Sequence, residues 1–144
     1  AHHAGMRYSS PMLSMPKPLE YALMVLGEIH AGAPGALFPA RGLCERLDIP
    51  FDVVSKALQR MKHAGIVRSV QGKYGGYQLA RDLGSLHLNE LAEVVVGPSA
   101  VATCLLPGHA CRHSTSCTIR RAVRRLDQRF QQLLVDTSIL DLIG

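Results

Sequence analysis

The sequence predicts a mainly helical fold of the α+β class, and three observations carry this prediction. Apolar residues recur at helical spacing in five separate segments. Two short alternating segments, 66–70 and 77–80, flank a glycine-rich turn after the third of these helical segments. Three helices followed by a β-hairpin is the order of a winged helix-turn-helix domain, so we expect a two-stranded wing and a long C-terminal helix.

The first two helices are expected at residues 18–29 and 40–47. Pro18 suits the first position of the helix at 18–29, and the glycine- and proline-containing segment 31–35 ends that helix. In the second helix, Cys44 shares an apolar face with two leucines. We therefore interpret Cys44 as a small core residue rather than a metal ligand.

The third helix is expected at residues 50–64, opened by Pro50 and closed by Gly65 as its C-cap. Its apolar stripe consists of Val54, Ala57, Leu58 and Met61. Its opposite face carries Asp52, Ser55, Lys56, Gln59 and His63. A short polar face that can form hydrogen bonds is typical of a helix in the DNA major groove, although a solvated helix face shows the same pattern.

Basic residues are concentrated where such a domain would contact phosphates. Eight lysines and arginines lie between Arg41 and Arg81, against three acidic residues. The formal net charge of +5 and the pI near 9.3 also favour an anionic partner. We expect double-stranded DNA to be contacted by Arg41, Ser55, Lys56, Gln59, Arg60, Gln71, Lys73 and Tyr74.

The two remaining helices are expected at residues 88–96 and 118–135. The longer one carries Ile119, Val123, Leu126, Phe130 and Leu133 in the 4-3-4-3 spacing of a heptad seam. A narrow apolar stripe on an otherwise polar helix indicates pairing with a second helix, so we expect a homodimer. The alternative is that this helix packs on its own N-terminal domain. The amphipathic segment 138–143 is expected to cover the end of the interface.

Three cysteines, Cys104, Cys111 and Cys117, are spaced C-x6-C-x5-C in a segment that favours a loop. Thiolates are soft ligands for iron–sulfur clusters, zinc or copper(I), and clustered cysteines in a cytoplasmic protein indicate metal or redox chemistry. We expect a 4Fe–4S or 2Fe–2S cluster. Zinc with His109 or His113, and a metal-free thiol switch, are the alternatives.

These features divide the chain into five parts. Residues 1–16 are expected to be a cloning remnant and a loose tail, 17–83 the DNA-binding domain, and 84–97 a connecting helix. Residues 98–117 form the cysteine loop, and 118–144 form the dimerisation helix and tail. We expect no membrane association, because the sequence has no apolar run of membrane-spanning length. A constitutive DNA- or partner-binding module with structural cysteines is the second hypothesis, and no substrate-binding motif supports an enzyme.

The chain resembles the Rrf family of winged-helix transcription regulators. The resemblance rests on the Glu-Tyr-Ala-Leu sequence at 20–23, on segment 64–70 entering the wing, on the Gly-x-x-Gly-Gly-Tyr motif at 72–77, and on the cysteine loop. It implies a homodimer on a palindromic operator, with the third helix in the major groove and the wing near the minor groove. In three-cysteine members it implies an iron–sulfur cluster that sets DNA affinity in response to iron–sulfur status, iron, nitric oxide or redox state. The family includes iron-responsive repressors.

The chain departs from the family pattern at three positions. Gln71 stands where the wing usually has an arginine, and Ser55 stands where the regulator of iron–sulfur assembly has a base-discriminating glutamate. Arg120 stands where that regulator has its histidine ligand. In the nitric-oxide-sensing branch, an acidic residue of the other protomer completes the site, and the resemblance places Glu20 there. Alternatives for the fourth ligand are His109, His113, Cys44, a small molecule or an unfilled position.

Overall fold

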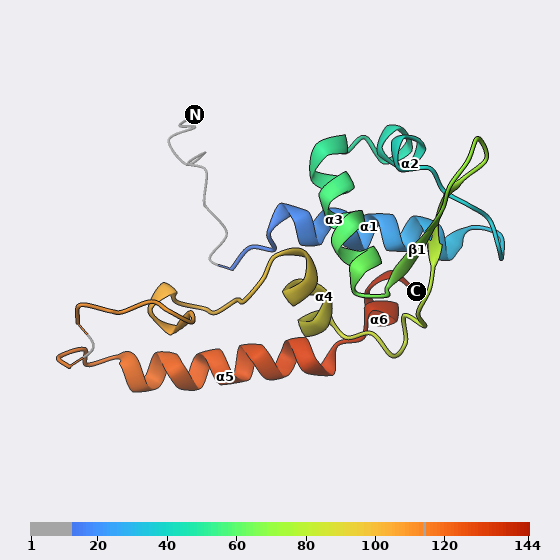
Figure 1. Cartoon of the computed structure of the whole chain (residues 1–144). Helices are drawn as coiled ribbons and strands as arrows, with labels where there is room; N and C mark the ends of the chain where they lie inside the picture. Colours follow the sequence, from blue (N-terminus) through green and yellow to red (C-terminus); the bar gives the residue numbers. More distant parts are fainter. Residues whose placement is uncertain (1–12, 114) are drawn as a thin grey trace, which may run out of the picture.

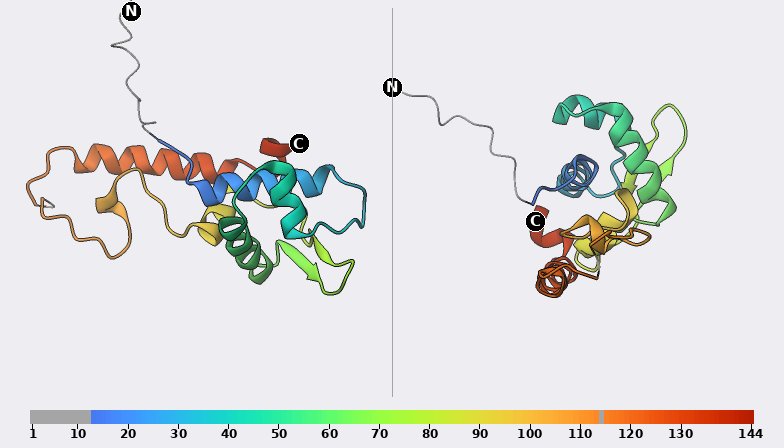
Figure 2. Two further views of the ribbon diagram at one scale, coloured as in Figure 1. Left: turned by 90° about the horizontal axis from the view of Figure 1, so that it is seen from above. Right: turned by 90° about the vertical axis from the view of Figure 1, so that its left-hand side faces the viewer.

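The helices and the β-hairpin pack around one core, whereas the cysteine loop and most of the helix at residues 120–136 extend away from it, as Figure 1 and Figure 2 show. A computed structural model describes residues 13–113 and 115–144 of the chain. The predicted fold class is confirmed, because the structure is mainly helical with one two-stranded antiparallel sheet. The elements are α1 (Lys17–Ala31), α2 (Ala40–Leu47), α3 (Phe51–His63), β1 (Val67–Val70), β2 (Gly76–Leu79), α4 (Leu88–Val95), the 3-10 turn η2 (Thr103–Leu105), α5 (Arg120–Asp136) and α6 (Ile139–Ile143).

The helix ends differ slightly from the predicted ones. Pro18 occupies the second helical position of α1, because Pro16 is the N-cap. Pro50 is the N-cap of α3 rather than its first residue, and Ala64 is its C-cap. Gly65 follows with a φ of 77°, a left-handed conformation that ends the helix at low steric cost.

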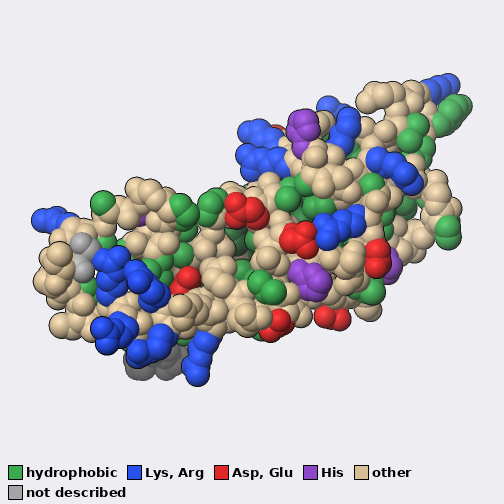
Figure 3. All heavy atoms as spheres, turned by 60° about the horizontal axis from the view of Figure 1, so that its bottom comes forward, with side chains coloured by type: hydrophobic (Ala, Val, Ile, Leu, Met, Phe, Trp, Pro, Cys, Tyr) green, Lys and Arg blue, Asp and Glu red, His purple; other side chains and the backbone are tan. Residues whose placement is uncertain are grey.

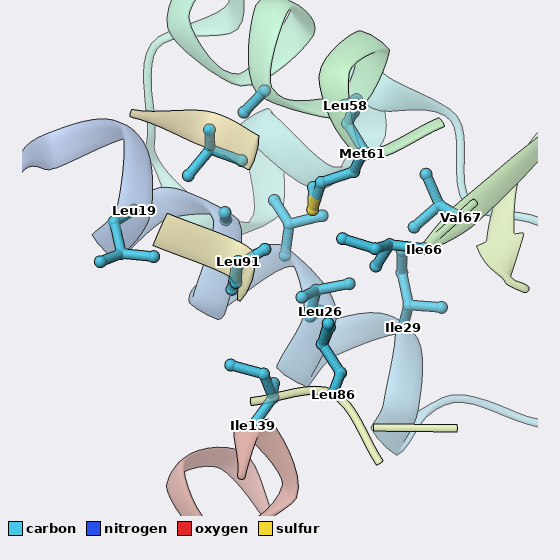
Figure 4. Close-up of a cluster of buried hydrophobic side chains, with 14 of the residues drawn as sticks. Leu19, Leu26, Ile29, Leu58, Met61, Ile66, Val67, Leu86, Leu91 and Ile139 are labelled. Atoms are coloured by element: carbon cyan, nitrogen blue, oxygen red, sulfur yellow. The ribbon is translucent and has the colours of Figure 1, made fainter. Parts of the chain in front are cut away.

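The core consists of side chains from α1, α2, α3, α4 and α6, from the start of the wing and from the segment before α4, together with Leu134 of α5. Leu26, Leu58, Leu91 and Ile139 are completely buried, and in Figure 4 Leu26 and Leu91 lie between Leu58 at one end of the cluster and Ile139 at the other. Cys44 belongs to this core, as predicted, and burial raises the pKa of its thiol. A thiol held in this way packs as a small apolar group.

The wing is supported by a third extended segment that the sequence pattern did not reveal. β1 and β2 pair in antiparallel register, with Ser69 opposite Tyr77. Phe38, in the loop before α2, forms a β-bridge to Tyr77 through hydrogen bonds of 2.9 and 2.8 Å. A Cβ atom on Gly76 would lie 2.6 Å from the carbonyl carbon of Phe38, so this approach requires glycine.

The C-terminal segment belongs to the same core as α1, α3 and α4. We expected it to cover the end of a dimer interface, but Ile139 of α6 is fully buried and Ile143 lies against Gly27 of α1. The Ile139 amide donates to the Leu86 carbonyl at 2.8 Å, which joins α6 to the segment before α4. The C-terminal segment therefore packs against the core of its own chain.

We expect Ser138→Ala to destabilise the fold by about 1 kcal/mol, as typical for loss of an N-cap side chain. The Ser138 hydroxyl accepts from the Asp141 amide at 3.1 Å, and the Asp141 carboxylate accepts from the Ser138 amide, forming a capping box. Urea unfolding followed by circular dichroism measures the change. Ser138→Thr should retain most of the stability, and an equal loss in both variants would show that the cap is unimportant.

No helix within residues 13–113 and 115–144 is long and apolar enough to cross a membrane.

Candidate nucleic-acid interface and cysteine loop

The face of α3 that was predicted to meet DNA lies on the surface. Lys56 and Gln59 are exposed, and Ser55 is half-buried. The opposite face of the helix is buried in the core, through Val54, Ala57, Leu58 and Met61. The packing of α3 on α1 therefore leaves one polar face of the helix available to a ligand.

A groove of about 350 Å³ lies between α3 and the wing. Three predicted DNA-contacting residues line it, namely Gln59, Gln71 and Lys73. Lys62 and Tyr77 also line it, although we did not predict them as site residues. Lys62 could have been found from its position three residues after Gln59 on the same helix, whereas Tyr77 depends on how the wing folds back. The groove combines two lysine side chains with two amide side chains.

Two other predicted residues lie at the ends of this surface. The Arg41 guanidinium of α2 stacks on the Phe51 ring at 4.3 Å from its centroid, which places it beside the first residue of α3. Tyr74 is exposed at the tip of the wing, and the ammonium of Lys73 lies 5.6 Å from its ring centroid.

Arg60 makes a contact within the protein that the sequence did not predict. Its guanidinium donates to the Val95 carbonyl at 2.9 Å, at the last residue of α4. A cation at the C-terminal end of a helix is favourable to the helix dipole. Arg60 therefore joins α3 to α4, and it does not line the groove between α3 and the wing.

The other end of α4 is joined to the wing domain by an ion pair. The guanidinium of Arg81, just after β2, contacts both carboxylate oxygens of Glu90 at 2.8 and 3.2 Å and donates to the Ser85 carbonyl at 2.9 Å. These hydrogen bonds hold the pKa of Glu90 below its usual value. Polar contacts thus connect α4 with α3 and with the segment that follows the wing.

Hydrogen bonds to α5 hold the beginning of the cysteine loop, and the later part of the loop is mostly irregular chain. The Val101 amide donates to Asp127 of α5 at 2.9 Å, and the Gln131 side chain of α5 donates to the Ser99 carbonyl at 2.9 Å. Cys104 lies in the short turn η2, whereas Cys111 and Cys117 lie in irregular chain. All three are half-buried free thiols.

The structure does not bring the three thiols together. Among the described residues, no group of three or more histidine, cysteine, aspartate or glutamate side chains is placed to hold a metal ion. The donor set nevertheless suits a thiolate-bound metal centre, because three free cysteines lie within fourteen residues of one loop. Binding would require the loop to close around the group.

The candidates for a fourth ligand lie in different environments. His109 and His113 are exposed on the loop, whereas Cys44 is in the core. The Glu20 side chain is 43% exposed in the first turn of α1 and pairs with Lys17 at 3.2 Å. No single protomer therefore presents a completed four-ligand site in its described residues.

The start of α1 and the start of the cysteine loop share a mostly apolar cavity of about 570 Å³. Leu13, Met15 and Leu19, before and at the start of α1, line the cavity together with Leu106 of the cysteine loop. Its α5 side is formed by Phe130, Leu133 and Leu134. The cavity places the cysteine loop, α1 and α5 next to one another.

The predicted seam of α5 divides into two edges. Ile119, Leu126 and Leu133 are 62%, 53% and 62% exposed. Val123 and Phe130 are half-buried. Phe130 packs against the core of its own chain, as expected if this helix packs on its own N-terminal domain. Ile119 is the N-cap of α5 rather than a residue of its first turn. The exposed edge therefore remains as the candidate dimer surface.

Basic side chains gather on two parts of the face shown in Figure 3, namely the end formed by α5 with the cysteine loop and the end formed by the DNA-binding domain. On α5 they are Arg120, Arg121, Arg124, Arg125 and Arg129.

Comparison with known proteins places the chain among transcriptional regulators. The family described as "Rrf2: Iron-dependent Transcriptional regulator" matches residues 15–144. The HTH-type transcriptional regulator IscR of Klebsiella pneumoniae subsp. pneumoniae is 24% identical over 124 residues, which cover 86% of this chain and 76% of that protein. IscR of Citrobacter koseri matches to the same extent. These relatives are regulators and not enzymes, as expected from the sequence.

Solved structures share the fold at low sequence identity. CymR, the global cysteine regulator of B. subtilis, superposes with a TM-score of 0.70 at 18% identity and covers 91% of this chain and 96% of its own. IscR of T. potens gives a TM-score of 0.66 at 16% identity, covering 91% and 86%. An oxidised form of Staphylococcus aureus CymR gives 0.70 at 16% identity, covering 92% and 97%.

Proposed function

Because this chain belongs to the Rrf2 family of transcriptional regulators, we propose that it is a homodimer whose binding to a palindromic operator is controlled by an iron–sulfur cluster. Cys104, Cys111 and Cys117 would hold the cluster. The observation that carries this proposal is the loop of three free thiols between α4 and α5, the two helices that would link it to DNA and to a second protomer.

In this proposal, α3 enters the major groove and the wing lies beside the adjacent minor groove. One DNA strand would then pass between α3 and the wing, where Lys62 and Lys73 flank the groove. Lysines there would neutralise phosphates, whereas the Gln59 amide would contact a base edge. The exposed polar face of α3 supports this division of roles.

We expect Lys73→Gln to weaken binding to all duplex sequences to a similar extent and to reduce the slope of log affinity against log salt by about 1. The reason is that one phosphate-neutralising charge is removed without changing a base contact. Fluorescence anisotropy across a salt series measures both quantities. Arg46→Gln is a matched control, because Arg46 pairs with Glu28 at 2.7 Å instead of lining the groove. A change in base preference in Lys73→Gln would contradict the proposed role.

The three thiolates supply negative charge and soft ligands, so a cluster bound there would cross-link the loop and respond to oxidants and to loss of iron. The fourth ligand is proposed to be Glu20 of the partner subunit, with His109 or His113 as alternatives. The cavity shared by the start of α1 and the start of the loop supports a role for this region of α1.

Contacts connect the loop with α5, α5 packs on α4, and α4 in turn contacts α3 and the segment after the wing. Asp127 and Gln131 fasten the start of the loop to α5, and Gly97, with a φ of 108°, separates that attachment from α4. Arg60 and Glu90 connect the two ends of α4 to α3 and to the segment after the wing. Closure of the loop would thus change the position of α4 and, with it, the spacing of α3 and the wing.

Anaerobic purification tests the proposal directly. A visible absorbance band, bound iron and sulfide, and a dimer mass carrying the cluster in native mass spectrometry are the expected results. Protein without absorbance and without iron after anaerobic reconstitution would overturn the cluster proposal.

A metal-free thiol switch is the second candidate. It is favoured by the separation of the three thiols and by the structural likeness to an oxidised CymR. In that case iron-free protein would change its DNA affinity after mild oxidation and recover it after reduction. A bound zinc ion in the same mass spectra would indicate a structural metal instead.

A further inference from the structure

A hydrogen bond joins α3 to the wing. The Nε2 of Gln59 on α3 donates to the phenol oxygen of Tyr77 on β2 at 3.4 Å. Both residues line the groove between α3 and the wing. Gln59 is exposed, and this bond restrains a side chain that otherwise has three rotatable torsions.

Tyr77 is itself held on a rigid platform. Its backbone pairs with Ser69 of β1 on one side and with Phe38 on the other, so it occupies the middle of a three-stranded arrangement. A Cβ atom on Gly76 would meet the backbone of Phe38, so the glycine before Tyr77 permits this arrangement. The ring of Tyr77 is half-buried and packs against the core, so the fold restricts where its phenol oxygen can lie.

The remaining hydrogen-bonding groups of Gln59 match one base. Its amide has two N–H donors and one oxygen acceptor, and Tyr77 uses one donor. One donor and the oxygen remain, and in the major groove adenine presents an acceptor at N7 beside a donor at N6. Guanine presents two acceptors there, so the remaining oxygen would face another acceptor.

We infer that Tyr77 is a specificity-determining positioning residue, which orients the Gln59 amide for an adenine in the operator half-site. This inference rests on the proposed binding of α3 in the major groove. By restraining the amide before DNA arrives, Tyr77 reduces the rotamer entropy that would otherwise be lost on binding. Its effect therefore acts on base preference through Gln59.

A double-mutant cycle tests the inference on the full-length protein. Selection from a randomised DNA duplex pool first identifies the preferred half-site, and dissociation constants are then measured for the four bases at the position that Gln59→Ala alters. We expect Gln59→Ala to reduce the preference for adenine over guanine roughly tenfold. Tyr77→Phe should reduce it roughly two- to fivefold, because the ring is kept and one hydrogen bond is lost.

Two controls separate positioning from a general effect on the fold. Tyr77→Phe should change nothing further in the Gln59→Ala background, whereas a purely structural role would give the same loss in both backgrounds. Tyr21→Phe removes a hydroxyl from a half-buried tyrosine of α1 and should leave the preference unchanged.

The possible outcomes distinguish this inference from the proposed function. If Gln59→Ala alters base preference but Tyr77→Phe does not, Tyr77 has no positioning role, and the proposed function stands. If neither changes it, Gln59 does not read a base, and the inference is wrong although DNA binding is retained. If the wild-type protein selects no sequence at all, the proposed operator binding fails and the inference fails with it.

Discussion

Cys111→Ala is expected to abolish the visible absorbance of anaerobically purified protein and to remove the difference in DNA affinity between cluster-loaded and apo protein. Cys111 is the middle thiol of the loop, with six residues to Cys104 and five to Cys117. Loss of Cys111 removes one of the three thiolates, so the proposed site keeps two thiolates and the carboxylate of Glu20 of the partner subunit, one ligand short of the usual four. Cys104 lies in the short 3-10 turn η2 and Cys117 in irregular chain, so neither remaining thiol is held by a strand or an α-helix in the described part of the loop.

Absorbance spectra, iron and sulfide content, and operator titrations of both forms measure this effect. Cys44→Ala is the matched control, because it removes a cysteine that is buried in the core of the DNA-binding domain. The control should retain the cluster while losing some stability through a small cavity. A Cys111→Ala protein that retains full iron content, or one whose DNA affinity still depends on the cluster, would contradict the assignment.

The DNA-binding domain could be predicted from sequence because its elements are specified by local patterns. Apolar residues at helical spacing, such as Leu58 and Met61, indicate the buried face of one helix, and the glycines of the wing indicate its turn. Contacts between distant segments were not predictable in this way. The bridge from Phe38 to Tyr77 and the packing of Ile139 beneath α1 depend on how completed elements meet in space.

The candidate site shows the same division. Exposure of Lys56 and Gln59 follows from helical periodicity and agrees with the prediction. The contact of Arg60 with the Val95 carbonyl could not be predicted from helical periodicity. A long basic side chain on a polar helix face has several possible partners within reach, and the position of α4 determines which of them it contacts. The heptad pattern of α5 likewise did not show that Phe130 packs on its own chain while Leu126 faces outward.

Leu126→Glu is expected to convert the proposed dimer to a monomer. Leu126 lies at the middle of the exposed edge of α5, seven residues from both Ile119 and Leu133, so a second helix would bury it at the centre of the contact. A carboxylate there would have to be desolvated without a partner, which is strongly unfavourable. Native mass spectrometry and light scattering report the assembly state directly.

DNA binding provides an independent measurement of the same change. A dimer binds two half-sites together, and loss of that linkage should reduce operator affinity by roughly a hundredfold or more, while affinity for an isolated half-site changes little. Leu142→Glu is the matched control, because Leu142 is a 47% exposed leucine of α6, outside the α5 edge. A Leu126→Glu protein that remains dimeric would place the interface elsewhere. The apolar cavity bounded by α1, α5 and the start of the cysteine loop would then be the next surface to test, because it contains Leu133 but not Leu126.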